Sequence, residues 1–182
     1  MTPLPIDLPH GDLRSIVLHW TAGDYESAYP AYHFCIALDS AARPVALATH
    51  DLRANMCDAA ASRSPYAAHT SGRNSYAIGL AVCGMAGATP QDFGPFPLRD
   101  EMLALTCATA ARLAAFYAIP LDREHVFTHA EAALADGYFG TGEDERWDIA
   151  RLGPSAEPLR ADEARRAGDA LRAMIGTCLR GS

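Results

Sequence analysis

The stretch that decides the fold is Ser15-Ile16-Val17-Leu18-His19, near the start of the chain. Three successive aliphatic residues, two of them β-branched, are typical of a short buried strand. The segment Thr21-Ala22-Gly23-Asp24 interrupts the apolar run, so we expect the strand to end at His19. Side chains at strand ends of α/β sheets commonly line a cleft, which makes this histidine a candidate functional residue.

The rest of the chain is organised around this strand. Similar apolar runs predict four more strands, and two longer segments with apolar residues at three- and four-residue spacing predict helices. A long loop is expected over residues 132–147, which are rich in glycine and acidic residues. The predicted strands cover residues 15–19, 32–38, 44–48, 77–83 and 126–128, and the predicted helices cover residues 98–117 and 161–179.

The order of these elements predicts the fold class. Alternating strands and helices indicate an α/β fold with a mixed central β-sheet flanked by helices. The length of 182 residues fits one domain. We expect this single domain to span residues 1–182, with an irregular N-terminal arm at residues 1–13 and a C-terminal helix within residues 153–182.

Charge and cysteine content restrict the classes of function. The formal net charge is −7, and all 15 basic residues are arginines. An acidic chain without an arginine cluster is a poor candidate for binding nucleic acid. No apolar stretch is long enough for membrane insertion. The five cysteines form no CxxC pair, so we expect reduced thiols. The N-terminal residues lack the pattern of a signal peptide, which predicts a cytoplasmic location.

Two histidines share one setting and together indicate a metal site. His19 and His129 each end a short predicted strand. Catalytic zinc sites use three protein ligands and leave a fourth position open, so a third ligand is needed. Asp148 is the first candidate and Glu131, two residues after His129, is its rival. Spacing alone leaves this choice open.

Five segments carry the remaining motifs. They are residues 16–23, residues 32–39, residues 68–79, residues 128–131 and residues 146–148. In this order they resemble segments of the zinc-dependent N-acetylmuramoyl-L-alanine amidases. These enzymes form the amidase-2 family, which shares its fold with peptidoglycan recognition proteins. The resemblance covers about residues 14–152, and it rests on the order of the motifs more than on any one of them.

The resemblance implies both a ligand set and a reaction. His19, His129 and Asp148 would bind a Zn²⁺ cofactor. The enzyme would hydrolyse the amide bond between the lactyl group of N-acetylmuramic acid and L-alanine, the first residue of the peptidoglycan stem peptide. We assign Tyr32 to orient water or pass a proton, and Arg146 to stabilise the oxyanion. Arginine stays protonated at neutral pH, so a proton donated from Arg146 is not expected.

The chain departs from the cytoplasmic recycling branch of the family at two positions. Ala81 stands where that branch has a strand glutamate, and Arg146 stands where it has a lysine. In these respects the chain looks more like the phage amidase lysozymes, and we expect an endolysin or lysin-like enzyme. Glu131, Glu143 or Glu145 could supply a carboxylate instead.

Three further residues are expected to contact the substrate. His69 occupies the position of the family's groove histidine and would bind the muramoyl or stem-peptide part. Asn74 is a candidate turn residue with a possible substrate contact, and Trp20 would wall the groove or join the core. Residues 138–142 form either a wall that recognises the stem peptide or a plain surface excursion.

Several alternatives stay open at this level. The protein could be a cytoplasmic enzyme that acts on recycled muropeptides, a secreted effector, or a non-catalytic peptidoglycan-binding module. A metal-free α/β domain with accidental motif similarity is the last alternative. As a lysin, the enzyme would reach the wall after release or through holin-dependent export. The expected partner is peptidoglycan or a muropeptide, and the expected oligomeric state is a monomer.

Overall fold

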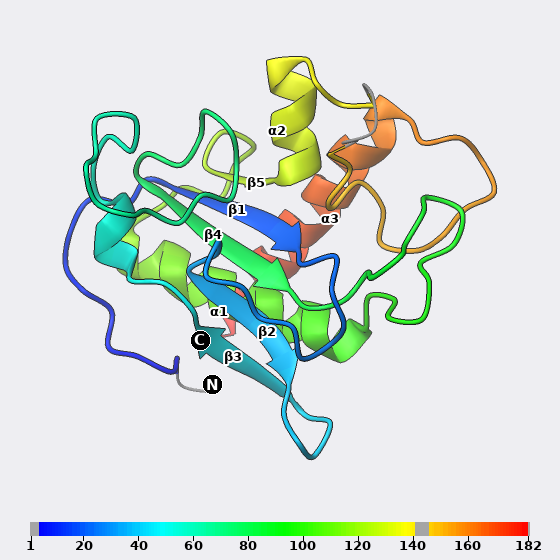
Figure 1. Cartoon of the computed structure of the whole chain (residues 1–182), viewed down its shortest axis with the longest axis horizontal. Helices are drawn as coiled ribbons and strands as arrows, with labels where there is room; N and C mark the ends of the chain where they lie inside the picture. Colours follow the sequence, from blue (N-terminus) through cyan, green and yellow to red (C-terminus); the bar gives the residue numbers. More distant parts are fainter. Residues whose placement is uncertain (1–3, 141–145, 182) are drawn as a thin grey trace.

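A five-stranded sheet forms the centre of the molecule in the computed structural model, which describes residues 4–140 and 146–181 (Figure 1). Helices α1 and α3 lie along one face of the sheet, and α2 packs near β1 and β5 on the opposite face. In chain order the elements are β1 (Ser15–Trp20), β2 (Phe34–Leu38), β3 (Pro44–Ala48), the 3-10 helix η1 (Leu52–Asn55), β4 (Ala77–Val82), α1 (Asp100–Tyr117), β5 (Val126–Thr128), α2 (His129–Asp136) and α3 (Ala161–Arg180).

The sheet is mixed, with strand order β3-β2-β4-β1-β5. Strand β1 lies between β4 and β5 and pairs with both in parallel. Strand β2 pairs in parallel with β4 and forms an antiparallel hairpin with β3. The predicted α/β class, with a mixed central sheet and flanking helices in a single domain, is therefore confirmed.

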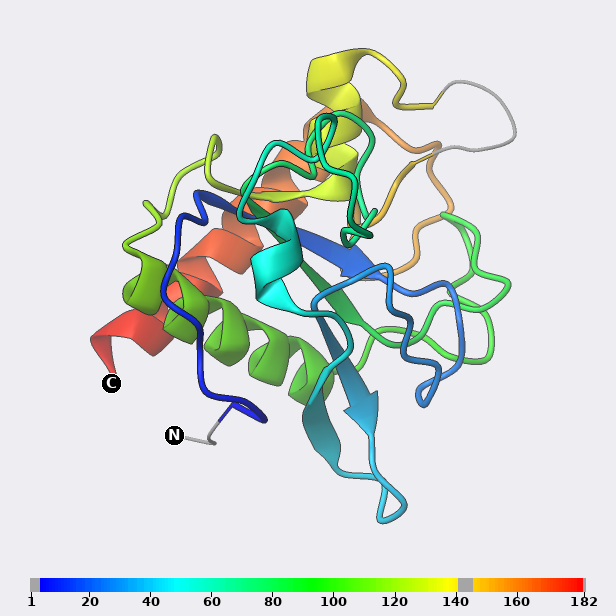
Figure 2. The same cartoon turned by 60° about the vertical axis from the view of Figure 1, so that its left-hand side comes forward.

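The two faces of the sheet have different surroundings. Ile16 and Leu18 of β1 point into the main apolar core, which includes residues of α1 and α3. These two helices pack against each other on this face (Figure 2). Val17 points the opposite way and packs with Ala132 of α2. Because successive side chains of a strand alternate between faces, His19 shares the face of Val17 and points away from the main core.

Three strand boundaries differ from the predicted ones. The strand predicted over residues 77–83 ends one residue earlier, at Val82. Strand β1 continues one residue past His19, because Trp20 still pairs with Val82 of β4. The second strand begins at Phe34 and not at Tyr32. The amide of Tyr32 donates to the carbonyl of Tyr29 across a turn, at 3.2 Å, so Tyr32 belongs to the approach to the strand.

The loop predicted over residues 132–147 is wrong in its first part, because α2 continues to Asp136. Thr128 caps this helix: its hydroxyl accepts from the amide of Glu131 at 3.1 Å, and the Glu131 carboxylate accepts from the amide of Thr128 at 3.0 Å. This reciprocal capping box is readable in sequence as Thr-x-x-Glu. Gly137 ends the helix in the left-handed region, with φ of 80°.

Glu131 also joins α2 to the C-terminal helix through a buried ion pair. Its carboxylate accepts hydrogen bonds of 2.8 and 2.9 Å from Arg172 of α3. Arg172 also donates to the backbone carbonyl of Val126 in β5, at 2.8 Å. Gly168 leaves room for this pair, because a Cβ at that position would overlap the Glu131 carboxylate. The pair therefore fixes where β5 ends and α2 begins.

Replacing Glu131 with alanine is expected to lower the free energy of unfolding by about 3 kcal/mol, because it leaves a buried guanidinium without its main partner. Urea denaturation followed by circular dichroism measures this change. Glu101→Ala is the matched control, since Glu101 forms an exposed pair with Arg99, and its loss should cost less than about 1 kcal/mol. Equal losses in the two variants would contradict a structural role for the buried pair.

His33 is a buried histidine directly before β2, and its ring centroid lies 5.9 Å from that of His69. Its Nδ1 accepts a hydrogen bond of 2.9 Å from the amide of Gly79 in β4. Burial lowers the pKa of His33 to about 3, so the folded protein holds this ring neutral. The unfolded chain, with an ordinary histidine pKa of about 6.5, binds a proton that the folded protein does not.

The free energy of unfolding should therefore fall as the pH drops below about 6.5, and the share of His33 should be about 1 kcal/mol between pH 7 and pH 5.5. His33→Asn keeps an acceptor for Gly79 and removes this share. Urea denaturation at both pH values compares wild type, His33→Asn and the exposed-site control His10→Asn. A pH dependence in His33→Asn as steep as in wild type would contradict the prediction.

Candidate metal centre and substrate pocket

The ends of two neighbouring parallel strands bring His19 and His129 together. Leu18 of β1 and Thr128 of β5 are register partners, and each histidine follows directly. His19 is fully buried and His129 is 7% exposed. Their ring centroids lie 4.9 Å apart. The strand pairing alone therefore accounts for this contact between residues more than a hundred positions apart in the chain.

Asp148 enters the same space from the loop that precedes α3. Its carboxylate oxygens lie 2.9 Å from Nδ1 of His19 and 3.2 Å from Nδ1 of His129. Burial alone would raise the pKa of Asp148, but hydrogen bonds and attraction from the two histidines outweigh burial and hold this pKa at about 2. The three side chains are buried, and their ligand atoms all lie within 4.8 Å of one another, so this group could hold a metal ion.

Backbone contacts fix the position of Asp148. Its carbonyl accepts a 2.7 Å hydrogen bond from the amide of Ala130, in the first turn of α2. Three residues later the buried guanidinium of Arg151 binds the carboxylate of Glu163 and four backbone carbonyls, one of them that of Pro90. The loop that carries Asp148 is thus tied to both α2 and α3.

Glu131, the rival third ligand, lies outside this group. Its carboxylate binds Arg172 and caps α2, as described above. The same contacts leave it unsuited to proton transfer at the pocket. Glu143 and Glu145, the other two carboxylates considered, lie outside the described residues.

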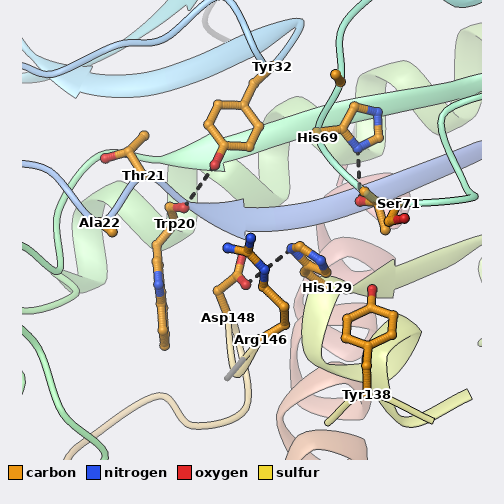
Figure 3. Close-up of a pocket in the computed structure, with 12 residues that line it drawn as sticks. Trp20, Thr21, Ala22, Tyr32, His69, Ser71, His129, Tyr138, Arg146 and Asp148 are labelled. Carbon is orange, nitrogen blue, oxygen red and sulfur yellow. Dashed lines mark hydrogen bonds and ion pairs between the residues drawn. The ribbon is translucent and has the colours of Figure 1, made fainter. Parts of the chain in front are cut away.

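A pocket of about 690 Å³ opens over the His-His-Asp group (Figure 3). Of the residues predicted from sequence to act at the site, the fully buried His19 does not line the pocket in the described part of the chain, and neither does Asn74. Its side chain instead accepts hydrogen bonds from two backbone amides of the neighbouring loop. The lining residues are Trp20, Thr21, Ala22, Tyr32, Ala68, His69, Thr70, Ser71, His129, Tyr138, Arg146 and Asp148.

Tyr32 lies against His19, with ring centroids 5.0 Å apart. Its hydroxyl donates a 3.3 Å hydrogen bond to the carbonyl of Trp20 and points into the pocket (Figure 3). Burial raises the pKa of Tyr32 well above its ordinary value. The phenol therefore keeps its proton at neutral pH and can donate a hydrogen bond.

Arg146 and Trp20 line the pocket, and Trp147 packs against Trp20. Arg146 is exposed and stands two residues before Asp148, so its guanidinium brings positive charge to the pocket mouth. Trp20 packs edge-on against Trp147, with ring centroids 4.4 Å apart. The sequence left open whether Trp20 lines the groove or joins the core. In the structure it does both.

Sequence reasoning missed Thr70, Thr21 and Ser71 as pocket residues. Thr70 is buried beside His69, and its position next to that histidine was the only signal available for it. Tyr138 lines the pocket as part of the predicted wall, and its ring lies 6.2 Å from that of His129. Residues 141 and 142 of that wall are outside the described ranges.

Fold and site together define an α/β domain with a candidate metal centre of the His-His-carboxylate kind that metal-dependent hydrolases use. Residues 9–146 match the family model of N-acetylmuramoyl-L-alanine amidases, Amidase_2. This match spans more than half of the chain, and the chain belongs to this family. A comparison with curated proteins gave no match. Membership supports peptidoglycan amidase activity. Over the described ranges, no helix has the length and apolarity needed to cross a membrane.

Replacing His129 with alanine is expected to abolish metal binding, because two of the three donors cannot hold an ion at comparable affinity. Isothermal titration with Zn²⁺ as the probe measures binding in the metal-free proteins. His10→Ala, a change at an exposed histidine that packs on Phe116, is the control and should bind as wild type does. Undiminished binding by His129→Ala would contradict the assignment.

Proposed function

We propose that the protein is a zinc-dependent amidase that hydrolyses the bond between the lactyl group of N-acetylmuramic acid and L-alanine of the stem peptide. The observation that carries this proposal is the buried His19, His129 and Asp148 group at the floor of an open pocket, in a chain of the amidase family. The substrate is peptidoglycan or a fragment of it.

The donor set fits Zn²⁺ on chemistry and on spacing. Two imidazoles and one carboxylate match known catalytic zinc sites, which keep a fourth position for water or substrate. Donors about 2.1 Å from a tetrahedral ion lie about 3.4 Å apart, close to the 2.9 and 3.2 Å between Asp148 and the two histidines. A bound zinc ion would polarise the amide carbonyl and lower the pKa of the attacking water.

Tyr32 supplies the hydrogen-bond donor of the proposed mechanism. Its phenol stays protonated and lies directly against His19. In the free protein it donates to the carbonyl of Trp20 over a long 3.3 Å contact. A substrate in the pocket offers a stronger acceptor, because the carbonyl oxygen gains negative charge as the amide is attacked. Tyr32 then orients the reacting groups or passes its proton.

Arg146 supplies positive charge for the same oxyanion. Its guanidinium lies at the pocket mouth beside Asp148 (Figure 3). A fixed cation stabilises charge that develops in the transition state. It holds its proton at neutral pH, so its role is electrostatic. His69 and Trp20 are proposed to contact the muramoyl or peptide part of the substrate, and their position in the pocket supports this. Asn74 is proposed as the turn residue that holds the loop of His69, because its side chain accepts from the His69 amide.

We further propose a lysin-like role. Ala81 of β4 is the register partner of His19. The position beside this proposed metal ligand therefore carries a methyl group, where the recycling branch carries a carboxylate. All three positions carry residues that can bind a metal ion, which favours an enzyme over a binding module.

Mass spectrometry of purified peptidoglycan, digested with and without a chelator, tests the proposed function. The expected result is release of stem peptides that begin at L-alanine, blocked by the chelator and restored by Zn²⁺. Cleavage of soluble muropeptides with intact sacculi left uncut would point to the recycling alternative. Zinc binding without cleavage of either substrate would point to a binding module and would overturn the enzymatic proposal.

Tyr32→Phe is expected to lower kcat by about 100-fold and to leave zinc bound, because it removes one donor to the oxyanion. Tyr117→Phe is a matched control, since it removes a hydroxyl that donates to a backbone carbonyl, that of Pro9, at 2.8 Å. Turnover on muropeptides and metal content are measured for both variants. An unchanged kcat in Tyr32→Phe would reduce Tyr32 to a packing residue.

A further inference from the structure

The second ring nitrogen of His19 lies in a hydrogen-bonded cluster that the proposed reaction does not use. While Nδ1 faces Asp148, Nε2 lies 3.3 Å from the hydroxyl oxygen of Thr70 and 3.4 Å from Nδ1 of His69. The Thr70 hydroxyl and His69 Nδ1 are themselves 3.0 Å apart. All three side chains are buried. The contacts are therefore made where little of the side chains is exposed.

The position of the proton on His19 decides whether its Nδ1 can bind a metal. A neutral imidazole carries one N–H, and the nitrogen that binds a metal must be the other one. The carboxylate of Asp148, 2.9 Å away, attracts the proton to Nδ1, which would block the ligand position. An acceptor at Nε2 attracts it to the far side. The hydroxyl oxygen of Thr70 can accept a hydrogen bond from this N–H, and the same hydroxyl can donate a hydrogen bond to Nδ1 of His69.

The loop that carries Thr70 is held against the sheet by side chains. The amide oxygen of Asn74 accepts from the backbone amides of His69 and Thr70, at 3.0 and 2.9 Å. The fully buried Asn55 binds the same loop through the backbone of Ala67 and the carbonyl of Asn74. Asn55 and Asn74 thus hold the loop on both sides of Thr70.

Gly79 of β4 makes the approach of this loop possible. A Cβ on Gly79 would lie 2.6 Å from ring atoms of His69. Gly79 and Val17 are register partners, so the His69 ring lies on the face that carries His19. The glycine thus lets the loop come close enough for Thr70 to reach Nε2.

We propose that Thr70, held by Asn74, is a positioning residue that keeps the proton of His19 on Nε2 and leaves Nδ1 free for the metal. Residues that hydrogen-bond to a metal ligand in this way typically change metal affinity by 10- to 100-fold. The proposal rests on the proposed function in assuming a metal at His19, but the hydrogen bond itself can be tested without metal.

Thr70→Val tests the proposal, because it keeps the shape of the side chain and removes the hydroxyl. We expect zinc affinity, measured by competition with a chromophoric chelator, to fall by 10- to 100-fold. Thr70→Ser should restore it. The matched control is Thr106→Val in α1, where a buried hydroxyl donates to the carbonyl of Met102 at 2.8 Å, and its affinity should equal that of wild type.

Nitrogen-15 NMR of the histidine rings in the metal-free proteins gives a second readout. We expect His19 to carry its proton on Nε2 in wild type and to shift toward Nδ1 in Thr70→Val. If wild type binds no zinc, the proposed function fails, while the NMR comparison still decides whether Thr70 sets the proton position. Unchanged NMR signals and unchanged affinity in Thr70→Val would overturn the inference.

Variants of Asn74 distinguish a role in positioning Thr70 from a role in contacting the substrate. Asn74→Ala should weaken zinc binding in the same direction as Thr70→Val, and Asn74→Asp, which keeps the accepting oxygen, should restore most of it. A raised KM with unchanged zinc affinity in Asn74→Ala would instead show that Asn74 acts on the substrate, and would overturn its place in this network.

Discussion

The parallel pairing of β1 with β4 and β5 is the constraint on which the rest of the structure depends. Register along β1 and β5 places His19 beside His129, and register along β1 and β4 places Gly79, against which the His69 ring packs, beside Val17. A shift of one residue in either pair would turn the histidine toward the apolar core. The main core of aliphatic residues, which α1 and α3 complete, therefore protects the geometry of the site as well as the stability of the domain.

Much of this arrangement was predictable from sequence. The strands were predictable because each is a short apolar run with a clear end, and the two long helices because their apolar spacing is regular. Helix α2 escaped prediction because half of its eight residues are alanine and the segment carries little periodicity, although the capping signal at Thr128 and Glu131 was present. His19 and His129 were found because each closes a short apolar run that predicts a strand.

The rest depended on contacts that spacing does not encode. Spacing left the choice between Asp148 and Glu131 open, and only the family resemblance favoured Asp148. The structure supplies the physical reason, because Arg172 binds the Glu131 carboxylate and Asp148 lies against the two histidines. The proposed role of Thr70 could not be predicted from sequence, because it depends on a loop that Asn55 and Asn74 hold against the sheet. The site is thus assembled from one predictable element, the strand end, and from loops whose placement depends on individual polar side chains.

The link from Arg172 through Glu131 to the start of α2 has a thermodynamic consequence for the last helix. Helix α3 lines no part of the pocket over the described residues, yet it holds the segment that presents His129 and, through Arg151 and Glu163, the loop that presents Asp148. A ligand that binds the folded state stabilises every element coupled to its site. Metal binding should therefore slow amide hydrogen exchange in α3, and any change that loosens this helix should weaken metal binding from a distance.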